Sequence, residues 1–107
     1  MTLSKVVFRP AAEADLTELY QYITDRSGQP QTAIGYIRRI RTYCETLASF
    51  PERGRRRDDL RRGRRVVGFE RRVVIVYMVL DTGEVEIGRI FYGGRNYEAL
   101  LQEEDEE

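Results

Sequence analysis

Residues 66–92, VVGFERRVVIVYMVLDTGEVEIGRIFY, decide the fold. Three runs rich in Val, Ile, Tyr and Phe follow one another there, separated by Glu70-Arg71 and by Asp81-Thr82-Gly83. β-Branched and aromatic residues bounded by short polar breaks are typical of strands joined by tight turns. The pattern predicts a three-stranded antiparallel meander with a hairpin turn at 81–83. Its strands cover residues 66–69, 71–79 and 84–92.

Two helices precede this meander. Apolar residues recur every three or four positions from Pro10 to about residue 26 and again from 31 to 50, which predicts one apolar face on each helix. The repeating positions are Ala12, Leu16, Leu19, Tyr20 and Ile23 in the first segment, and Ala33, Ile37, Ile40, Cys44 and Leu47 in the second. Gly28 and Pro30 predict the turn between the helices, and Pro51 predicts the end of the second. The middle strand is apolar on both faces, so we expect it at the centre, with the helices covering one side.

Short elements complete the fold at both ends. Residues 3–8, LSKVVF, predict a first strand, and residues 96–101, NYEALL, predict a short final helix. The predicted class is α+β, with the order β-α-α-β-β-β and a two-helix hairpin packed on a small antiparallel sheet. We expect residues 1–102 to form a single domain and the acidic residues 103–107 to form a flexible tail.

The composition excludes several kinds of chemistry. The 107 residues include no His and one Cys, so the chain cannot assemble a Ser-His-Asp triad, a Cys-His pair, a His-ligated zinc site or an internal disulfide. We expect Cys44 to be a buried, inert thiol, and we expect no metal and no cofactor. The longest apolar run, residues 73–80, is far shorter than the ~20 residues of a membrane helix. The N-terminal residues show no signal-peptide core, so we expect a cytoplasmic protein without membrane contact.

Charge is distributed unevenly along the chain. Basic and acidic residues number 18 each, but residues 103–107 are all acidic, whereas residues 52–72 contain ten Arg against four acidic side chains. Lys5 is the only lysine. Guanidinium groups pair with carboxylates and phosphates through two parallel hydrogen bonds, so this bias favours an anion-binding surface.

The Arg-rich segment 52–65 has two interpretations. In the first, it presents an anion-binding surface to an acidic polypeptide, a nucleic acid or a phosphate-rich complex. In the second, it is a solvated loop whose arginines pair with Asp58, Asp59, Glu70 and the acidic tail. The segment contains no aromatic residue, so we expect no stacking platform for single-stranded nucleic acid.

A second candidate site is the end of the last strand, residues 89–97, RIFYGGRNY. Two Arg, two Tyr and Gly93-Gly94 lie within nine residues, and glycines let backbone N–H groups approach an anion. Tyr can relay a proton, whereas Arg stays protonated. In the alternative interpretation, Phe91 and Tyr92 pack on opposite faces of the strand and the glycines only form a turn.

A series of motifs occurs in order over residues 5–101. The motifs are Phe8-Arg9-Pro10-Ala11-Ala12, Asp15-Leu16, Tyr22-Ile23, Ala33…Ile37…Ile40, Leu47…Phe50-Pro51…Gly54, Leu60-Arg61-Arg62-Gly63-Arg64-Arg65, Val74-Ile75-Val76-Tyr77 and Ile87…Arg89-Ile90-Phe91-Tyr92-Gly93-Gly94-Arg95-Asn96. In this order and spacing the chain resembles the RelE/ParE superfamily of bacterial toxins, and most of all its ParE branch.

The resemblance implies the toxin of a type II toxin–antitoxin system, neutralised by a ParD-like antitoxin in a heterotetramer or larger complex. In the family, acidic and apolar residues of the antitoxin's disordered C-terminal part meet a basic groove on the toxin. The residues then expected to bind the antitoxin are Arg57, Arg61, Arg62, Arg64, Arg65 and Arg72. ParE toxins are associated with inhibition of DNA gyrase, so gyrase is the expected target, and no direct DNA binding is expected of the toxin alone. The residues expected to meet the target are Arg89, Tyr92, Arg95, Asn96 and Tyr97.

Three hypotheses about activity follow. The first is a gyrase inhibitor that acts by binding and is not itself an enzyme. The second is a RelE-like, ribosome-dependent mRNA nuclease; RelE-type enzymes place an Arg three residues before the tyrosine of the central strand, where this chain has Val74 before Tyr77. The third is a non-toxic relic that still binds the antitoxin, because Tyr92 and Asn96 stand where family members commonly have His and Asp.

Overall fold

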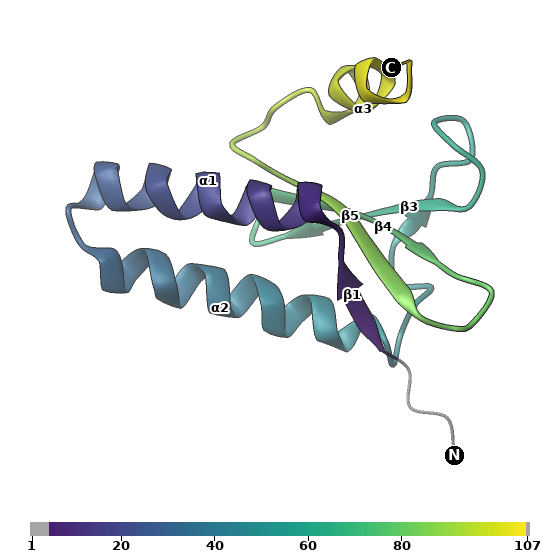
Figure 1. Cartoon of the computed structure of the whole chain (residues 1–107), viewed down its shortest axis with the longest axis horizontal. Coiled ribbons are helices and arrows are strands. Elements are labelled where there is room, and N and C mark those ends of the chain that lie inside the picture. Colours follow the sequence, from purple (N-terminus) through teal and green to yellow (C-terminus); the bar gives the residue numbers. More distant parts are fainter. Residues whose placement is uncertain (1–4, 107) are drawn as a thin grey trace.

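The computed structural model describes residues 5–106, which form a five-stranded mixed sheet and three helices (Figure 1). In chain order the elements are β1 (Val6–Phe8), α1 (Pro10–Ser27), α2 (Pro30–Thr46), β2 (Arg55–Arg56), β3 (Arg64–Phe69), β4 (Val73–Val79), β5 (Val85–Tyr92) and α3 (Tyr97–Asp105). The strand order across the sheet is β1-β5-β4-β3-β2, in which β1 pairs with β5 in parallel and the other neighbours pair antiparallel. The apolar run of β4 thus lies at the centre of the sheet, as predicted.

Helices α1 and α2 form a hairpin that packs its apolar faces on one side of the sheet (Figure 1). Each helix has a proline in its first turn, where the missing N–H has no helical partner to lose. Gly28 ends α1 in the left-handed conformation, with φ 69°. Beneath the hairpin lie the inward-facing residues of the two longest strands, which are Val73, Ile75 and Tyr77 of β4 and Val85, Ile87 and Ile90 of β5. This is the main core, and Tyr77 is fully buried in it.

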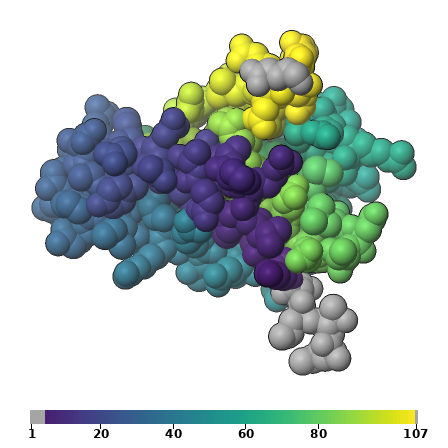
Figure 2. Space-filling view, viewed as in Figure 1, coloured from purple at the N-terminus to yellow at the C-terminus, as the bar shows by residue number. Residues whose placement is uncertain are grey.

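Helix α3 covers the opposite side of the sheet. Its Leu101 is buried in a second apolar cluster with Val66, Val76 and Phe91. In the space-filling view, α3 lies between α1 and the Arg-rich segment (Figure 2). The hairpin of α1 and α2 covers one face of β4 and α3 covers the other. Because both faces are buried, the strand is apolar without interruption.

A β-bulge in β5 sets which side chains face which helix. Strand residues alternate faces, yet Ile87 and Ile90 both reach the main core although they are three positions apart. Val76 pairs with Arg89 and Tyr77 pairs with Ile87, so Gly88 is an extra residue in β5. This extra residue shifts the alternation of faces by one position. As a result Arg89 lies on the α3 side, with its guanidinium carbon 4.7 Å from the centre of the Phe91 ring.

The predicted fold class is confirmed, with four differences in detail. First, β1 pairs in parallel, so the sheet is mixed. Second, Arg55–Arg56 form a two-residue edge strand within the segment expected to be a loop. Third, α2 ends at Thr46, before Pro51, because the next residues tighten into turns: Leu47 donates to the carbonyl of Cys44. Fourth, residues 103–105 of the expected tail continue α3, and Glu107 lies outside the described residues.

Three expectations concern the Cys44 thiol, membrane-spanning helices and metal binding. Burial raises the pKa of the Cys44 thiol to about 12, so the thiol stays protonated at neutral pH. Within residues 5–106, no helix is long and apolar enough to cross a bilayer, and no group of three His, Cys, Asp or Glu side chains gathers that could hold a metal ion. The predicted strand residues Leu3 and Ser4 lie outside the described residues.

Candidate functional site

Four arginines converge on the side of the sheet that α3 covers. Arg57, Arg61, Arg64 and Arg89 each lie within ion-pair distance of a carboxylate of α3, and we call these four residues the arginine face. They come from three separate places: the Arg-rich segment, β3 and β5. The sheet brings them together because β3 and β5 flank β4.

Arg64 and Arg57 are the most enclosed members of the arginine face. Arg64 is buried at the start of β3 and donates to both carboxylate oxygens of Asp105, at 3.0 and 3.4 Å. The side chain of Arg57 is only 13% exposed and donates to Asp59, to Glu98 and to the hydroxyl oxygen of Tyr97. Hydrogen bonds to Asp59 and then to Glu98 raise the pKa of Arg57 further above its usual value. The Arg57 guanidinium group therefore remains charged.

Arg89 ties α3 to α1 across the edge of the sheet. It donates through Nε and Nη2 to the two carboxylate oxygens of Asp15, at 2.8 and 3.0 Å, and through Nη1 to Glu104. Asp15 also accepts from the backbone N–H of Ile90 at 2.8 Å. The pKa of Arg89 is raised, mainly by its hydrogen bond to Asp15, against the opposing effect of burial.

Helix α3 is fixed at its start by residues that the sequence placed at the target site. The side-chain oxygen of Asn96 accepts from the N–H of Ala99 at 3.2 Å, which makes Asn96 the N-cap. Tyr97 packs against Phe91, with ring centres 6.3 Å apart, and accepts from Arg57. Both residues therefore have a structural role at α3.

A groove of about 260 Å³ stays open beside α3. Its lining includes Arg9 and three members of the arginine face, Arg61, Arg64 and Arg89, together with Met78, Gly88 and the carboxylates of Glu86 and Glu104. The lining thus combines four arginines, two carboxylates and several apolar side chains, which suits a segment that carries both acidic and apolar side chains.

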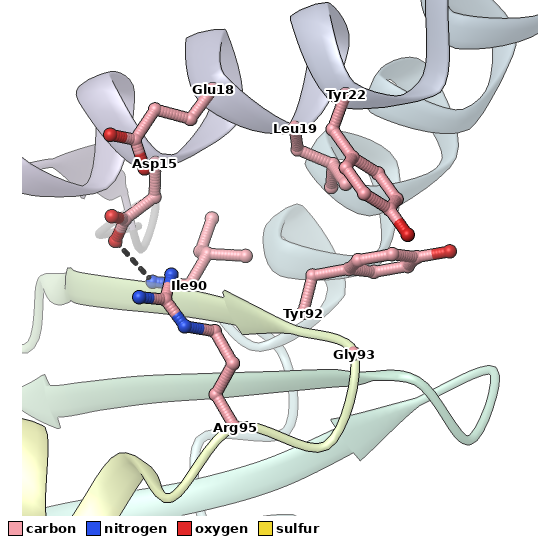
Figure 3. A pocket seen from close by; sticks show the side chains of 8 residues that line it. All are labelled: Asp15, Glu18, Leu19, Tyr22, Ile90, Tyr92, Gly93 and Arg95. Carbon is pink, nitrogen blue, oxygen red and sulfur yellow. Dashed lines mark hydrogen bonds between the residues drawn. The ribbon is translucent and has the colours of Figure 1, made fainter. Parts of the chain in front are cut away.

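A second hollow, of about 390 Å³, lies between α1 and the end of β5 (Figure 3). Tyr92 and Arg95 line its sheet side, and Asp15, Glu18 and Tyr22 line its helix side. The Tyr22 and Tyr92 rings meet edge to face, with centres 5.6 Å apart, and Tyr22 is 45% exposed. Of the five residues expected to meet the target, Tyr92 and Arg95 are the two that line this hollow.

The predicted antitoxin residues do not form one group. Arg57, Arg61 and Arg64 belong to the arginine face, and Arg62 is exposed next to them. Arg65 instead donates to the carbonyl of Gly54 at 2.8 Å on the hairpin side of the sheet. Arg72 lies at the far end of the sheet, beside Tyr22, Arg26 and Tyr92. These arginines are close in the sequence, but successive residues of a strand point to opposite faces of the sheet. Closeness in the sequence therefore does not predict which of them meet.

The internal pairs that the solvated-loop interpretation predicted are largely present. Arg56 pairs with Asp58 and Arg57 with Asp59, and the acidic C-terminal residues pair with the arginine face. Glu70 pairs with Arg39 of α2 rather than with the Arg-rich segment. The arginine face therefore already holds carboxylates, which are those of α3.

Asp15 and Arg9 belong to the ordered motifs, but the sequence pattern predicted no role at the site for either. Asp15 is separated from Arg89 by 74 positions, so no local pattern joins them. One signal was available: Asp15 falls on the apolar stripe of α1, three positions after Ala12 and four before Leu19. A carboxylate on a buried stripe usually has a cationic partner.

Comparisons with known proteins agree with this architecture. A model of the ParE toxin of the type II toxin–antitoxin system parDE matches residues 6–97. The fold is also similar to a solved chain of the chromosomal ParDE TA system from P. aeruginosa, with a TM-score of 0.72 and 23% identity, covering 84% of this chain and 96% of that chain. No curated protein sequence matches the chain. The protein is thus a member of the ParE toxin family of type II toxin–antitoxin systems.

Proposed function

We propose that this toxin is neutralised by a ParD-like antitoxin and inhibits DNA gyrase by binding to it. The observation that carries the proposal is the arginine face, which holds carboxylates of a helical segment with paired, charge-assisted hydrogen bonds. An antitoxin segment with acidic and apolar side chains fits the same chemistry. Assembly as a heterotetramer or larger complex in the cytoplasm is part of this proposal.

Binding, rather than bond-making, suits the side chains that the site presents. The pKa values of Arg57 and Arg89 are raised, so neither can accept a proton near neutral pH. Burial raises the pKa of Tyr77, the tyrosine of the central strand, and holds its hydroxyl away from solvent between Gly54 and Pro51. A nuclease needs a group that activates the attacking 2′-hydroxyl, and neither these arginines nor Tyr77 can supply one.

Gyrase inhibition has a direct test in the supercoiling reaction. We expect purified protein to reduce supercoiling by gyrase, and a ParD-like antitoxin added first to restore it. Arg95→Glu changes an exposed residue of the hollow beside Tyr92 and should weaken inhibition by about tenfold or more, since it places a carboxylate beside Asp15 and Glu18. Arg38→Glu makes the same charge change at an exposed position of α2 that does not line this hollow, and serves as the matched control.

Three outcomes would contradict the proposal. Unimpaired supercoiling at saturating protein would exclude gyrase as the target. Codon-specific cuts in mRNA on translating ribosomes would favour the nuclease. Normal growth on strong expression of the chain alone would favour the non-toxic relic.

A further inference from the structure

Two tyrosine rings lie between two hollows at the end of β5. Tyr22 of α1 and Tyr92 of β5 line both the hollow of about 390 Å³ (Figure 3) and a neighbouring hollow of about 250 Å³. Tyr36 of α2 also meets the Tyr92 ring, with centres 6.0 Å apart, so aromatic contacts with both helices hold Tyr92. Tyr22 is the only tyrosine within residues 5–106 that is classed as exposed. An aromatic surface is thus open to a ligand at this place.

Three arginines line the two hollows. Arg95 lines the larger one, and Arg26 and Arg72 line the smaller one. All three are exposed, and none makes an ion pair in the part of the chain that the structure describes. The members of the arginine face, in contrast, each pair with a carboxylate of α3. The charges beside the two rings therefore remain available to an anion from outside the chain.

Acidic side chains do not cancel this charge. Two carboxylates line the larger hollow, and the smaller hollow has none. Asp15 is held by Arg89, so Glu18 is the one lining carboxylate that lacks an ion pair within residues 5–106. Three guanidinium groups against one carboxylate leave the surroundings of the rings positive.

The turn between β3 and β4 fixes the position of Arg72. Glu70 and Arg71 adopt left-handed backbone conformations, with φ 48° and 66°, which are uncommon for residues other than glycine and concentrate at functional sites. Arg39 of α2 donates to both carboxylate oxygens of Glu70, at 3.0 and 3.2 Å. The N–H of Gly93 donates to the carbonyl of Arg72 at 3.0 Å. The turn is thus tied to α2 and to the end of β5, which holds Arg72 beside the rings.

A single nucleic-acid strand has the chemistry that fits this arrangement. Unpaired bases stack on aromatic side chains, and phosphates pair with guanidinium groups. Because arginines line the hollows on both sides of the ring pair, a strand with one base at the rings can bring its neighbouring phosphates to both sides. A free mononucleotide would fill only one side. Duplex DNA keeps its bases inside the stack, so it would meet only the charges.

The ring of Tyr22 can accept a base at little cost. The guanidinium carbon of Arg26 lies 5.2 Å from the centre of this ring. Stacking of a base on an aromatic ring is stronger than an exposed cation–π contact. A base can therefore take the place of Arg26 over the ring, and the exposed Arg26 side chain is then free to meet a phosphate.

We propose that Tyr22, Tyr92, Arg26, Arg72 and Arg95, which we call the tyrosine–arginine surface, bind a single strand of DNA. The rings and charges give the class of ligand. The choice of DNA over RNA rests on the proposed function, in which the target enzyme acts on DNA. The inference departs from the expectation that the toxin alone does not bind DNA.

Fluorescence anisotropy of a labelled oligodeoxythymidine of about twelve nucleotides, titrated with the full chain, tests the inference. Tyr22→Ala should weaken binding by about tenfold, because it removes the ring on which a base stacks. Tyr22→Phe keeps the ring and should bind as the unchanged chain does. Phe50→Ala is the matched control, because Phe50 is also exposed and has Arg53 over its ring, at 5.2 Å, but lines neither hollow.

The salt dependence of binding tests the arginines separately from the rings. Arg72→Gln should lower the affinity by about threefold and reduce the slope of log K against log salt concentration by about 0.7, as expected for one phosphate contact of a single strand. Arg38→Gln removes the same charge at an exposed position of α2 that lines neither hollow, and should change neither quantity.

Equal affinity of the unchanged chain and Tyr22→Ala would overturn the inference. A duplex of the same length, or thymidine monophosphate, that binds as tightly as the single strand would also overturn it. An RNA strand bound about tenfold more tightly than the DNA strand would overturn the choice of DNA. The titration contains no gyrase, so its failure leaves the supercoiling result standing. Strand binding without inhibition of supercoiling would refute the proposed function and leave the tyrosine–arginine surface intact.

Discussion

Gly54→Ala is expected to lower the free energy of unfolding by about 2–4 kcal/mol. A methyl group at Gly54 would lie 2.6 Å from the hydroxyl oxygen of Tyr77 and 2.8 Å from a carbon of its ring. Tyr77 cannot move aside cheaply because its ring is fully buried in the main core.

The hydrogen bonds at Gly54 add to that cost. The N–H of Gly54 donates to the Tyr77 hydroxyl oxygen at 2.8 Å, and the same hydroxyl donates to the carbonyl of Pro51 at 2.8 Å. Arg65 donates to the carbonyl of Gly54, also at 2.8 Å. Displacing the ring would leave buried polar groups without partners, and it would loosen the segment that leads into the arginine face.

Gly35→Ala is the matched control, because nothing lies within 4 Å of a methyl group at that position of α2. Alanine should stabilise the helix there by about 0.5–1 kcal/mol. Urea denaturation followed by circular dichroism measures both variants. A Gly54→Ala protein as stable as the unchanged chain would show that the Tyr77 contact is not tight in solution.

Asp15→Ala is expected to cost about 2–4 kcal/mol. The Asp15 side chain is 9% exposed and accepts three hydrogen bonds, two from Arg89 and one from the N–H of Ile90. Removing the carboxylate leaves the Arg89 charge partly buried with Glu104 as its remaining partner, and leaves the Ile90 N–H unpaired. The loss is therefore larger than that of an exposed ion pair.

Glu18→Ala provides the control for Asp15. Glu18 lies on the same helix, three positions later, is exposed, and makes no ion pair among residues 5–106. Its removal should change the unfolding free energy by less than about 0.5 kcal/mol. Equal losses of unfolding free energy for the two variants in denaturant titrations would contradict this prediction. They would mean that the Asp15–Arg89 pair contributes little to stability.

The sequence predicted those parts of the fold that depend on local patterns. The 3.6-residue period predicted α1 and α2, the uninterrupted apolar run predicted the central position of β4, and Asp81–Gly83 predicted a hairpin that the structure confirms. The parallel pairing of β1 could not be predicted, because it joins Val6 to Val85 and no residue of either strand specifies the partner.

The site was harder to predict than the fold. Strand alternation and the bulge at Gly88 decide which arginines meet, so Arg89 joins the arginine face whereas Arg65 and Arg72 do not. The C-terminal acidic residues looked like a tail by composition, yet Glu104 and Asp105 are ordered by pairing with arginines 15 and 41 positions away. Pairings of this kind follow from the folded sheet and not from spacing along the chain.

We propose that the guanidinium groups on the α3 side of the sheet bind an acidic polypeptide. The most direct test is the affinity of a cognate ParD-like antitoxin for Arg61→Glu/Arg62→Glu, compared with the unchanged chain and with Arg26→Glu/Arg71→Glu, which reverses two exposed arginines away from the arginine face. Docking predicts a loss of about 30-fold or more for the first variant only, with the unfolding free energy changed by less than about 1 kcal/mol. Equal affinity for all three proteins would contradict the claim.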